Sequence, residues 1–244
     1  MRNKQQDLKS RIILALDFQD FEEGKSWIDR FGSQLTTFKM GPVMFLNKGF
    51  AGLAELSSYN IDLFLDLKLH DIPNTLSQTV ANIVRNDISM FTIHSMGGYE
   101  MMNTVCNEVK RHSSETSRPR PMVLAVTVLT SHDRESLMDI GISGSVEDEV
   151  LRLAKLSDKA GVDGLVCSGY EVANLRKEFG ERFKLIVPGV RINGDKLDQK
   201  RVVTPLQALS NGADYIVIGR SITRSPDPEA TVDAIVGSLG QLPP

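Results

Sequence analysis

Apolar residues recur along the chain in eight short runs of the kind that form β-strands. These runs cover residues 11–16, 36–40, 63–68, 90–94, 122–128, 164–167, 184–187 and 215–218. Between them lie stretches with apolar residues at helical spacing, at 22–31, 43–56, 76–84, 147–159 and 171–179. Strands that alternate with helices in this way pair in parallel and are joined by right-handed crossovers. The pattern therefore predicts an α/β protein.

A closed barrel is the arrangement that best accommodates eight such repeats. The chain has 244 residues and shows no break for a second domain, so we expect a single (β/α)8 TIM barrel over residues 1–244. A doubly wound open sheet is the alternative, but its dinucleotide fingerprint GxGxxG is absent after the first run. Two long polar segments, at 131–145 and 192–201, are expected to be lids or binding loops.

Composition narrows the class of protein further. The net charge is −3, from 28 basic and 31 acidic residues, which favours neither a nucleic-acid nor a membrane-surface partner. The N-terminus is polar, and the longest apolar run, at 122–129, is shorter than the ~18 residues that a membrane helix needs. Cys106 and Cys167 are far apart and form no CxxC motif. We expect a soluble cytoplasmic protein without disulfides.

The third run carries charges where a buried strand is normally apolar. Side chains alternate along a strand, so Phe64, Asp66 and Lys68 share one face, and Asp71 follows where the strand ends. A structural ion pair is the alternative explanation, but buried pairs are weak stabilisers. We favour a catalytic array in which Lys68 is the acid and the aspartates set its protonation and geometry. Asn74 is expected to cap the following helix.

Charged residues also close other strands at the end where barrels of this kind hold their chemistry. Lys39 lies near the end of the second run and could pair with Asp66 or with Asp17, which follows the first run. Helix capping is a serious alternative for Asp17. His94 ends the fourth run, and we expect a hydrogen-bonded structural role for it in preference to a catalytic one.

The last two strands are followed by residues suited to an anion. Arg191 lies after the seventh run, and Gly219 and Arg220 lie after the eighth. A phosphate site recurs at these two loops in the barrel fold, where glycine exposes backbone N–H groups and arginine adds bidentate hydrogen bonds. A surface salt bridge is the alternative for each arginine. No HExxH pair, cysteine cluster or EF-hand loop indicates a metal site.

Taken together, these segments resemble one enzyme family. The stretch FLDLKLHDIPNT at 64–75 is similar to the signature of orotidine 5′-phosphate decarboxylases of bacterial type. Further segments resemble motifs of the same family: LALD at 14–17, FKMG at 38–41, VLTS at 128–131, PGVR at 188–191, DQKR at 198–201 and IGRS at 218–221. The DxKxxD core alone is shared with related barrel decarboxylases and aldolases, whereas its extension from His70 to Thr75 is specific.

The resemblance implies a reaction and a set of roles. The reaction converts orotidine 5′-monophosphate to uridine 5′-monophosphate and CO₂, the last step of UMP biosynthesis, without a cofactor or metal. The implied catalytic residues are Lys68 as proton donor, Asp66, Asp71 and Lys39. The implied substrate-binding residues are Asp17, Lys39, Asp66, Thr75, Thr130, Ser131, Arg191, Gln199, Gly219 and Arg220. Asp71 and Thr75 would reach the partner's site in a homodimer. The loop before Gln199 is slightly shorter than the family pattern, which leaves the neighbouring Lys200 as an alternative.

Two other functions compete with this interpretation. A metal-dependent sugar-phosphate decarboxylase or hexulose-phosphate aldolase would share the DxKxxD core, but such relatives place a carboxylate near the end of the second strand, where this chain has Lys39. A catalytically silent barrel that binds a phosphorylated ligand is the other alternative. The complete set of Asp66, Lys68 and Asp71 argues against it.

Overall fold

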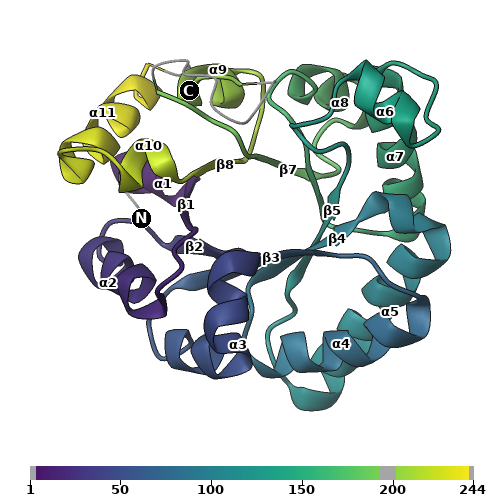
Figure 1. Ribbon diagram of the computed structural model, residues 1–244, viewed down its shortest axis with the longest axis horizontal. Coiled ribbons are helices and arrows are strands. Elements are labelled where there is room, and N and C mark those ends of the chain that lie inside the picture. Colours follow the sequence, from purple (N-terminus) through teal and green to yellow (C-terminus); the bar gives the residue numbers. More distant parts are fainter. Residues whose placement is uncertain (1–3, 193–201, 242–244) are drawn as a thin grey trace.

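The computed structural model describes residues 4–192 and 202–241, and its strands form a closed, all-parallel barrel (Figure 1). The strands are β1 (Ile12–Leu16), β2 (Thr37–Met40), β3 (Asp62–Leu69), β4 (Met90–His94), β5 (Met122–Val126), β6 (Gly164–Val166), β7 (Lys184–Val187) and β8 (Tyr215–Ile218). Each strand pairs with the next, and β8 closes the ring by pairing with β1, with Ile12 beside Ile216. The predicted (β/α)8 barrel is confirmed, and the open sheet is excluded.

The helices form a ring outside the strands in Figure 1. They are α1 (Lys4–Ser10), α2 (Phe21–Phe31), α3 (Pro42–Leu56), α4 (Pro73–Arg85), α5 (Gly98–Thr116), α6 (Arg134–Asp139), α7 (Val146–Ala160), α8 (Val172–Phe179), α9 (Pro205–Ser210), α10 (Arg220–Thr223) and α11 (Pro228–Leu239), with a 3-10 turn, η1 (Ser95–Gly97). Local chemistry sets their ends. The Asp20 side chain accepts the Glu22 N–H at the start of α2, and Gly161, with φ 81°, ends α7. Within the described residues, no helix is long and apolar enough to cross a membrane.

The structure corrects four local predictions. The third strand extends to Leu69, and β5 ends at Val126, two residues earlier than its apolar run. Part of the polar 131–145 segment is helical, because Asp133 opens α6 with a capping box. Asn74 does not cap α4, since Pro73 occupies the first turn and Ile72 is the N-cap residue.

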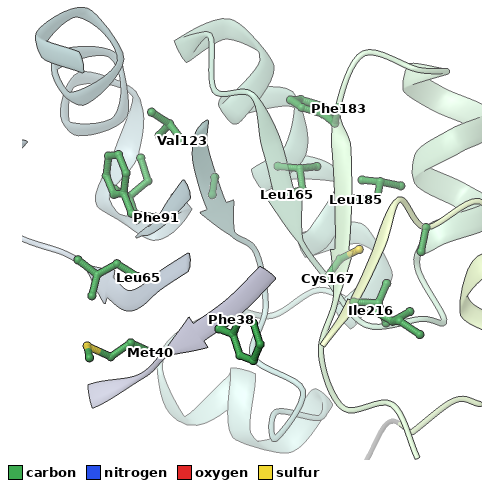
Figure 2. Close-up of a cluster of buried hydrophobic side chains, with 14 of the residues drawn as sticks. Phe38, Met40, Leu65, Phe91, Val123, Leu165, Cys167, Phe183, Leu185 and Ile216 are labelled. Atoms are coloured by element: carbon green, nitrogen blue, oxygen red, sulfur yellow. The ribbon is translucent and has the colours of Figure 1, made fainter. Parts of the chain in front are cut away.

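The strands are apolar on both faces, and this gives the barrel two cores. Inside the ring a small cluster contains Phe64, Leu124 and Ile186. Between the ring and the helices a larger cluster contains the alternate residues of the same strands, among them Leu65 and Phe91, which Figure 2 shows with their neighbours. This arrangement is typical of parallel barrels, in which helices cover the outer face of every strand. The inner core also forms the floor of the site described below.

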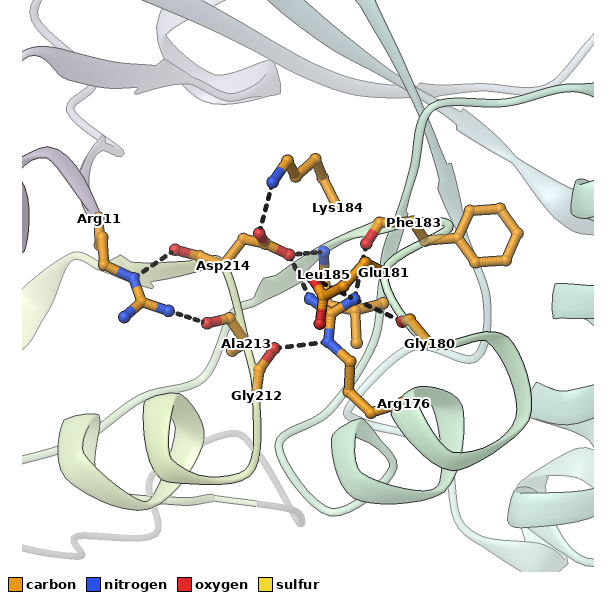
Figure 3. Close-up of polar contacts among 10 residues, drawn as sticks. All are labelled: Arg11, Arg176, Gly180, Glu181, Phe183, Lys184, Leu185, Gly212, Ala213 and Asp214. Atoms are coloured by element: carbon orange, nitrogen blue, oxygen red, sulfur yellow. Dashed lines mark hydrogen bonds and ion pairs between the residues drawn. The ribbon is translucent and has the colours of Figure 1, made fainter. Parts of the chain in front are cut away.

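An ion network holds the opposite end of the barrel, where β7 and β8 begin (Figure 3). The Asp214 carboxylate accepts hydrogen bonds from Lys184 Nζ at 2.8 Å, from the Leu185 N–H at 2.8 Å and from Arg176. Arg176 also donates to the carbonyls of Gly212 and Phe183. Burial alone would raise the pKa of Asp214, but Lys184, the Leu185 N–H and Arg176 hold it below its ordinary value of 3.8.

Replacing Asp214 with Asn should lower the free energy of unfolding by about 2–3 kcal/mol, because it removes the close counter-charge of the partly buried Arg176 cation and leaves it paired with the exposed Glu181, at 3.7 Å. The pKa of Asp214 is lower in the folded protein than in the unfolded chain, so its stabilising contribution is complete above the unfolded value. That contribution is lost as the pH falls through the lowered folded value, and the difference between wild type and variant should shrink below about pH 4. Urea unfolding at several pH values measures both effects. Asp233→Asn is the control, because this exposed carboxylate is paired with Lys9 at 3.5 Å, a surface contact that contributes little to stability.

Candidate active site

A cavity of ≈ 330 Å³ opens at the carboxyl ends of the strands. Its floor is made of inner-core side chains, including Phe64, Val126 and Ile186. Its walls carry the polar residues that the sequence predicted: Asp17, Lys39, Asp66, Lys68, Thr130, Ser131, Arg191, Gly219 and Arg220. Residues from strands far apart in the chain therefore meet here, as the barrel topology requires. The cavity combines an apolar floor with a small number of converging polar groups, which is typical of a small-molecule site.

Four charged side chains form a continuous row on one wall of the cavity. Lys39 Nζ lies 3.2 Å from Asp17 Oδ1 and 3.4 Å from Asp66 Oδ2. The other oxygen of Asp66 lies 2.9 Å from Lys68 Nζ. The charges alternate from Asp17 through Lys39 and Asp66 to Lys68, so each neighbour stabilises the next. We call this set the charge row. Lys39 does pair with both aspartates that the sequence offered as partners.

Asp66 lies at the buried centre of the charge row, with its side chain only 12% exposed. Burial tends to raise the pKa of this carboxyl group. The positive charges of Lys39 and Lys68, together with hydrogen bonds from Lys68 and Thr92, outweigh burial and bring the pKa below its ordinary 3.8. Asp66 is therefore ionised at neutral pH. A buried carboxylate kept ionised between two ammonium groups is poorly explained by stability alone, because desolvation consumes much of the Coulomb gain.

The backbone at Lys68 departs from a regular strand. Leu65 pairs with Phe91 and Leu69 pairs with Ile93, so three residues of β3 lie opposite the single residue Thr92 of β4. Within this bulge Lys68 has φ 49°, the left-handed region that is unfavourable for a residue with a side chain. The Lys68 N–H finds a partner in the Thr92 hydroxyl of β4, at 2.8 Å. The bulge aims Lys68 into the cavity, and neither it nor the contact with Thr92 was predicted from the sequence.

Gly41, in the FKMG segment at 38–41, makes room for the charge row, a role that was not predicted from the sequence. A Cβ atom at this position would lie 3.0 Å from Asp17 Oδ1 and 3.2 Å from Lys39 Nζ. Both separations are tighter than ordinary contacts, so a side chain here would push against the Asp17–Lys39 pair. The absence of a side chain at Gly41 leaves room for that pair. The signal in the sequence was a glycine directly after the strand that carries Lys39 near its end.

Two arginines occupy the side of the cavity formed by the ends of β7 and β8. Arg191 is buried, with 7% of its surface exposed, and its Nη1 donates to the Val190 carbonyl at 3.3 Å. Gly189 precedes it with φ 75°, a conformation that glycine adopts without strain. Arg220 begins α10, directly after Gly219. Two guanidinium groups at the two expected loops give the cavity a positive side suited to an anion such as phosphate.

His94 has the hydrogen bond expected of a structural residue. Its Nδ1 accepts the Met96 N–H at 3.4 Å, and its ring stacks on His70 with centroids 5.8 Å apart. Burial, followed by the nearby His70 and Lys68, lowers the pKa of His94 to about 4, so the ring is neutral near pH 7. Across residues 4–192 and 202–241, no three His, Cys, Asp or Glu side chains are grouped so that they could hold a metal ion.

The comparison with known proteins decides the family. A sequence model described as the "Orotidine 5'-phosphate decarboxylase / HUMPS family" matches residues 10–235. The chain belongs to this family. It is 42% identical over 234 residues to the orotidine 5′-phosphate decarboxylase of Haemophilus influenzae (strain PittEE), a match covering 96% of this chain and 100% of the relative. The enzyme of the same name from Wolbachia pipientis subsp. Culex pipiens (strain wPip) is 41% identical over 228 residues, covering 93% and 98%. The family resemblance drawn from the motifs is thus confirmed.

A solved structure of the orotidine 5′-phosphate decarboxylase family supports the fold independently. The crystal structure of orotidine 5′-phosphate decarboxylase from Lactobacillus acidophilus superposes with a TM-score of 0.83 at 30% identity, covering 94% of this chain and 99% of that one. The barrel described above is therefore the architecture of the family.

Two of the described residues that the family pattern singles out do not lie in the cavity of this chain. Asp71 and Thr75 are exposed and do not line it, and the Asp71 carboxylate accepts the N–H of the adjoining Ile72, at 2.7 Å. Their assignment to a partner's site stays a prediction. Gln199, with its alternative Lys200, lies outside the described residues.

Proposed function

We propose that this protein decarboxylates orotidine 5′-monophosphate to uridine 5′-monophosphate. The observation that carries the proposal is the charge row, which places Lys68 and the ionised Asp66 in one cavity with Arg191 and Arg220. The named function of the relatives, which are similar over almost their whole length, supports the same reaction. A cavity of ≈ 330 Å³ is also of the size that a single nucleotide requires.

The polarity of the cavity suggests how the nucleotide binds. Its 5′-phosphate would lie against Arg191 and Arg220, with Gly219 allowing close approach. Asp17 and Lys39 would bind the ribose hydroxyls between the two ends. Thr130 and Ser131, which line the cavity after β5, would face the pyrimidine ring. This orientation directs C6 of the ring, with its carboxylate, toward Lys68 and Asp66.

We propose that Lys68 supplies both the charge and the proton for the reaction. The bond between C6 and the carboxylate carbon breaks, CO₂ leaves, and the electron pair stays on C6 as a carbanion in the plane of the ring. With the nucleotide bound in this orientation, the Lys68 ammonium group would stabilise that charge and then transfer a proton to C6, becoming a neutral amine that solvent reprotonates. Asp66 holds Lys68 at 2.9 Å and places a negative charge beside the departing carboxylate. Preorganised charge of this kind is effective because it needs no rearrangement during the reaction.

We further propose that two copies of the chain form a dimer in which Asp71 and Thr75 complete the partner's site. Both residues lie on the exposed segment that follows β3, close in sequence to Lys68 but outside its cavity. Ile72, between them, is an apolar side chain that is 65% exposed and that a partner chain would cover in such a dimer. A shared site would explain why Asp66 and Lys68 line the cavity of the chain while Asp71, from the same DxKxxD pattern, lies outside that cavity.

Turnover tests the proposed function directly. Purified protein should convert orotidine 5′-monophosphate to uridine 5′-monophosphate with release of one CO₂ per molecule, measured by chromatography and mass spectrometry. Orotidine, which lacks the phosphate, should react far more slowly because it makes no contact with Arg191 and Arg220. Absence of uridine 5′-monophosphate would contradict the proposal, and turnover of a sugar phosphate instead would favour the metal-dependent relatives.

A further inference from the structure

A buried hydroxyl lies behind the charge row and contacts two of its members. Thr92, in the middle of β4, is 0% exposed and does not line the cavity. Its Oγ1 accepts the Lys68 N–H at 2.8 Å and donates to Asp66 Oδ1 at 3.0 Å. Asp66 Oδ1 is also the atom that receives Lys68 Nζ, at 2.9 Å. A closed circuit therefore runs from the Lys68 backbone through Thr92 and Asp66 to the Lys68 ammonium group.

We propose that Thr92 is a positioning residue that sets the geometry of Asp66 and Lys68 for catalysis, an inference that rests on the proposed decarboxylation. Thr92 cannot touch the substrate from its place behind the wall, so it acts through these two side chains. Its hydroxyl is suited to the task because one atom both accepts from the backbone and donates to the carboxylate.

The strained backbone at Lys68 explains why such a contact is needed. The bulge in β3 removes the regular hydrogen bonds to β4 between Leu65 and Leu69, and Lys68 has φ 49° there. A residue in that region persists only when its surroundings hold it in place. The Thr92 hydroxyl replaces the missing partner of the Lys68 N–H, and it thereby fixes the direction in which the Lys68 side chain leaves the strand.

The same hydroxyl fixes Asp66. A carboxylate held only by two lysines can rotate between them, because an ammonium group can donate hydrogen bonds in many directions. Thr92 adds a directed hydrogen bond to Oδ1, which leaves Oδ2 facing Lys39 at 3.4 Å. The groups that face Asp66 are then Lys39, Lys68 and Thr92. Thr92 and Lys68 contact Oδ1, and Lys39 contacts Oδ2. A rotation of the Asp66 carboxylate would therefore move the ammonium group of Lys68 away from C6.

Thr92→Val, which keeps the shape and removes the hydroxyl, is the variant that tests this role. We expect kcat for orotidine 5′-monophosphate to fall by about 10- to 100-fold, as for loss of a hydrogen bond to a charged group. KM should change by less than about threefold, because the phosphate contacts at the other side of the cavity are untouched. Thr92→Ser, which restores the hydroxyl, should recover most of kcat. Thr127→Val is the matched control, since Thr127 is also 0% exposed and its hydroxyl donates only to the Val166 carbonyl, at 3.0 Å.

A second readout separates this inference from the proposed function. Carbon NMR of the Asp66 carboxyl group, assigned with Asp66→Asn, should show a higher pKa in Thr92→Val than in wild type, because a hydrogen bond to the charged form is lost. Thr127→Val should leave that pKa unchanged.

The pKa measurements do not depend on which substrate the protein uses. Wild-type protein that is inactive on orotidine 5′-monophosphate would therefore contradict the proposed function and leave the role of Thr92 to be decided by the pKa of Asp66. Equal losses of kcat in Thr92→Val and Thr127→Val, or no recovery in Thr92→Ser, would overturn the role of Thr92. If Thr92→Val does not fold, the kcat of Thr92→Ser still tests the proposal, because serine keeps the hydroxyl and lacks the methyl group of threonine. A kcat near that of wild type would assign the role to the hydroxyl, and a large loss would assign it to the methyl group.

Discussion

Lys68→Ala should reduce kcat for orotidine 5′-monophosphate by about 10³-fold or more, because one substitution removes both the proton donor and the cation that faces the carbanion. It also leaves the buried Asp66 with Lys39 as its one remaining cation in the row. Stopped assays with long incubation, calibrated with authentic uridine 5′-monophosphate, can follow so slow a reaction. Ethylammonium ions added to the variant should restore part of the rate, since they can enter the space that the lysine side chain leaves.

Lys48→Ala is the control for this prediction. Lys48 is similarly exposed, 35% against 36% for Lys68, and it is paired with the carboxylates of Glu22 and Glu55 on the surface of the barrel. The control variant should keep wild-type kcat and KM. If Lys68→Ala retained nearly full activity while remaining folded, the assignment of Lys68 as proton donor would be wrong.

A mixed dimer of Lys68→Ala and Asp71→Ala chains should regain about half of the wild-type activity per dimer, although each variant alone is strongly impaired. In the mixed dimer one cavity has an intact Lys68 and receives an intact Asp71 from the other chain, whereas the second cavity lacks both. Co-expression with two different affinity tags, followed by tandem purification, isolates the mixed species for kinetic measurement.

The pairing of Lys68→Ala with Asp66→Ala gives the matched control for the mixed dimer. Asp66 and Lys68 lie in the same cavity, 2.9 Å apart, so no site in that mixed dimer is intact and no activity should return. A mixed dimer of Lys68→Ala and Asp71→Ala that stays as inactive as its parents would show that Asp71 does not act across the interface. Protein that sediments as a monomer with full activity would contradict the shared site as well.

Much of the fold and of the charge row followed from patterns in the sequence. The alternation of β-rich and helical runs was sufficient for the barrel, because parallel strands with crossover helices admit few arrangements. The two-residue period of a strand placed Asp66 and Lys68 on one face, and the common location of strand ends brought in Lys39 and Arg191. These inferences depend on periodicity and topology, which survive small errors in the ends of elements.

The features that escaped sequence reasoning arise from contacts between distant segments. The bulge at Lys68 depends on how β3 pairs with β4, and nothing in residues 62–69 alone requires it. The double role of Thr92 appears only when β4 lies beside that bulge. The prediction that Asn74 caps α4 failed for a local reason, because Pro73 is the first residue of the helix and Ile72, two residues before Asn74, is the N-cap. Contacts between neighbouring strands are therefore where the sequence is least informative.

The most direct test of the central claim is the rate at which purified protein consumes orotidine 5′-monophosphate, followed by ultraviolet absorbance with and without EDTA. Our account predicts rapid loss of the substrate signal at the same rate in both samples, since Lys68 and the charge row carry the chemistry. No turnover by folded protein, or turnover that EDTA abolishes and a divalent metal restores, would contradict it.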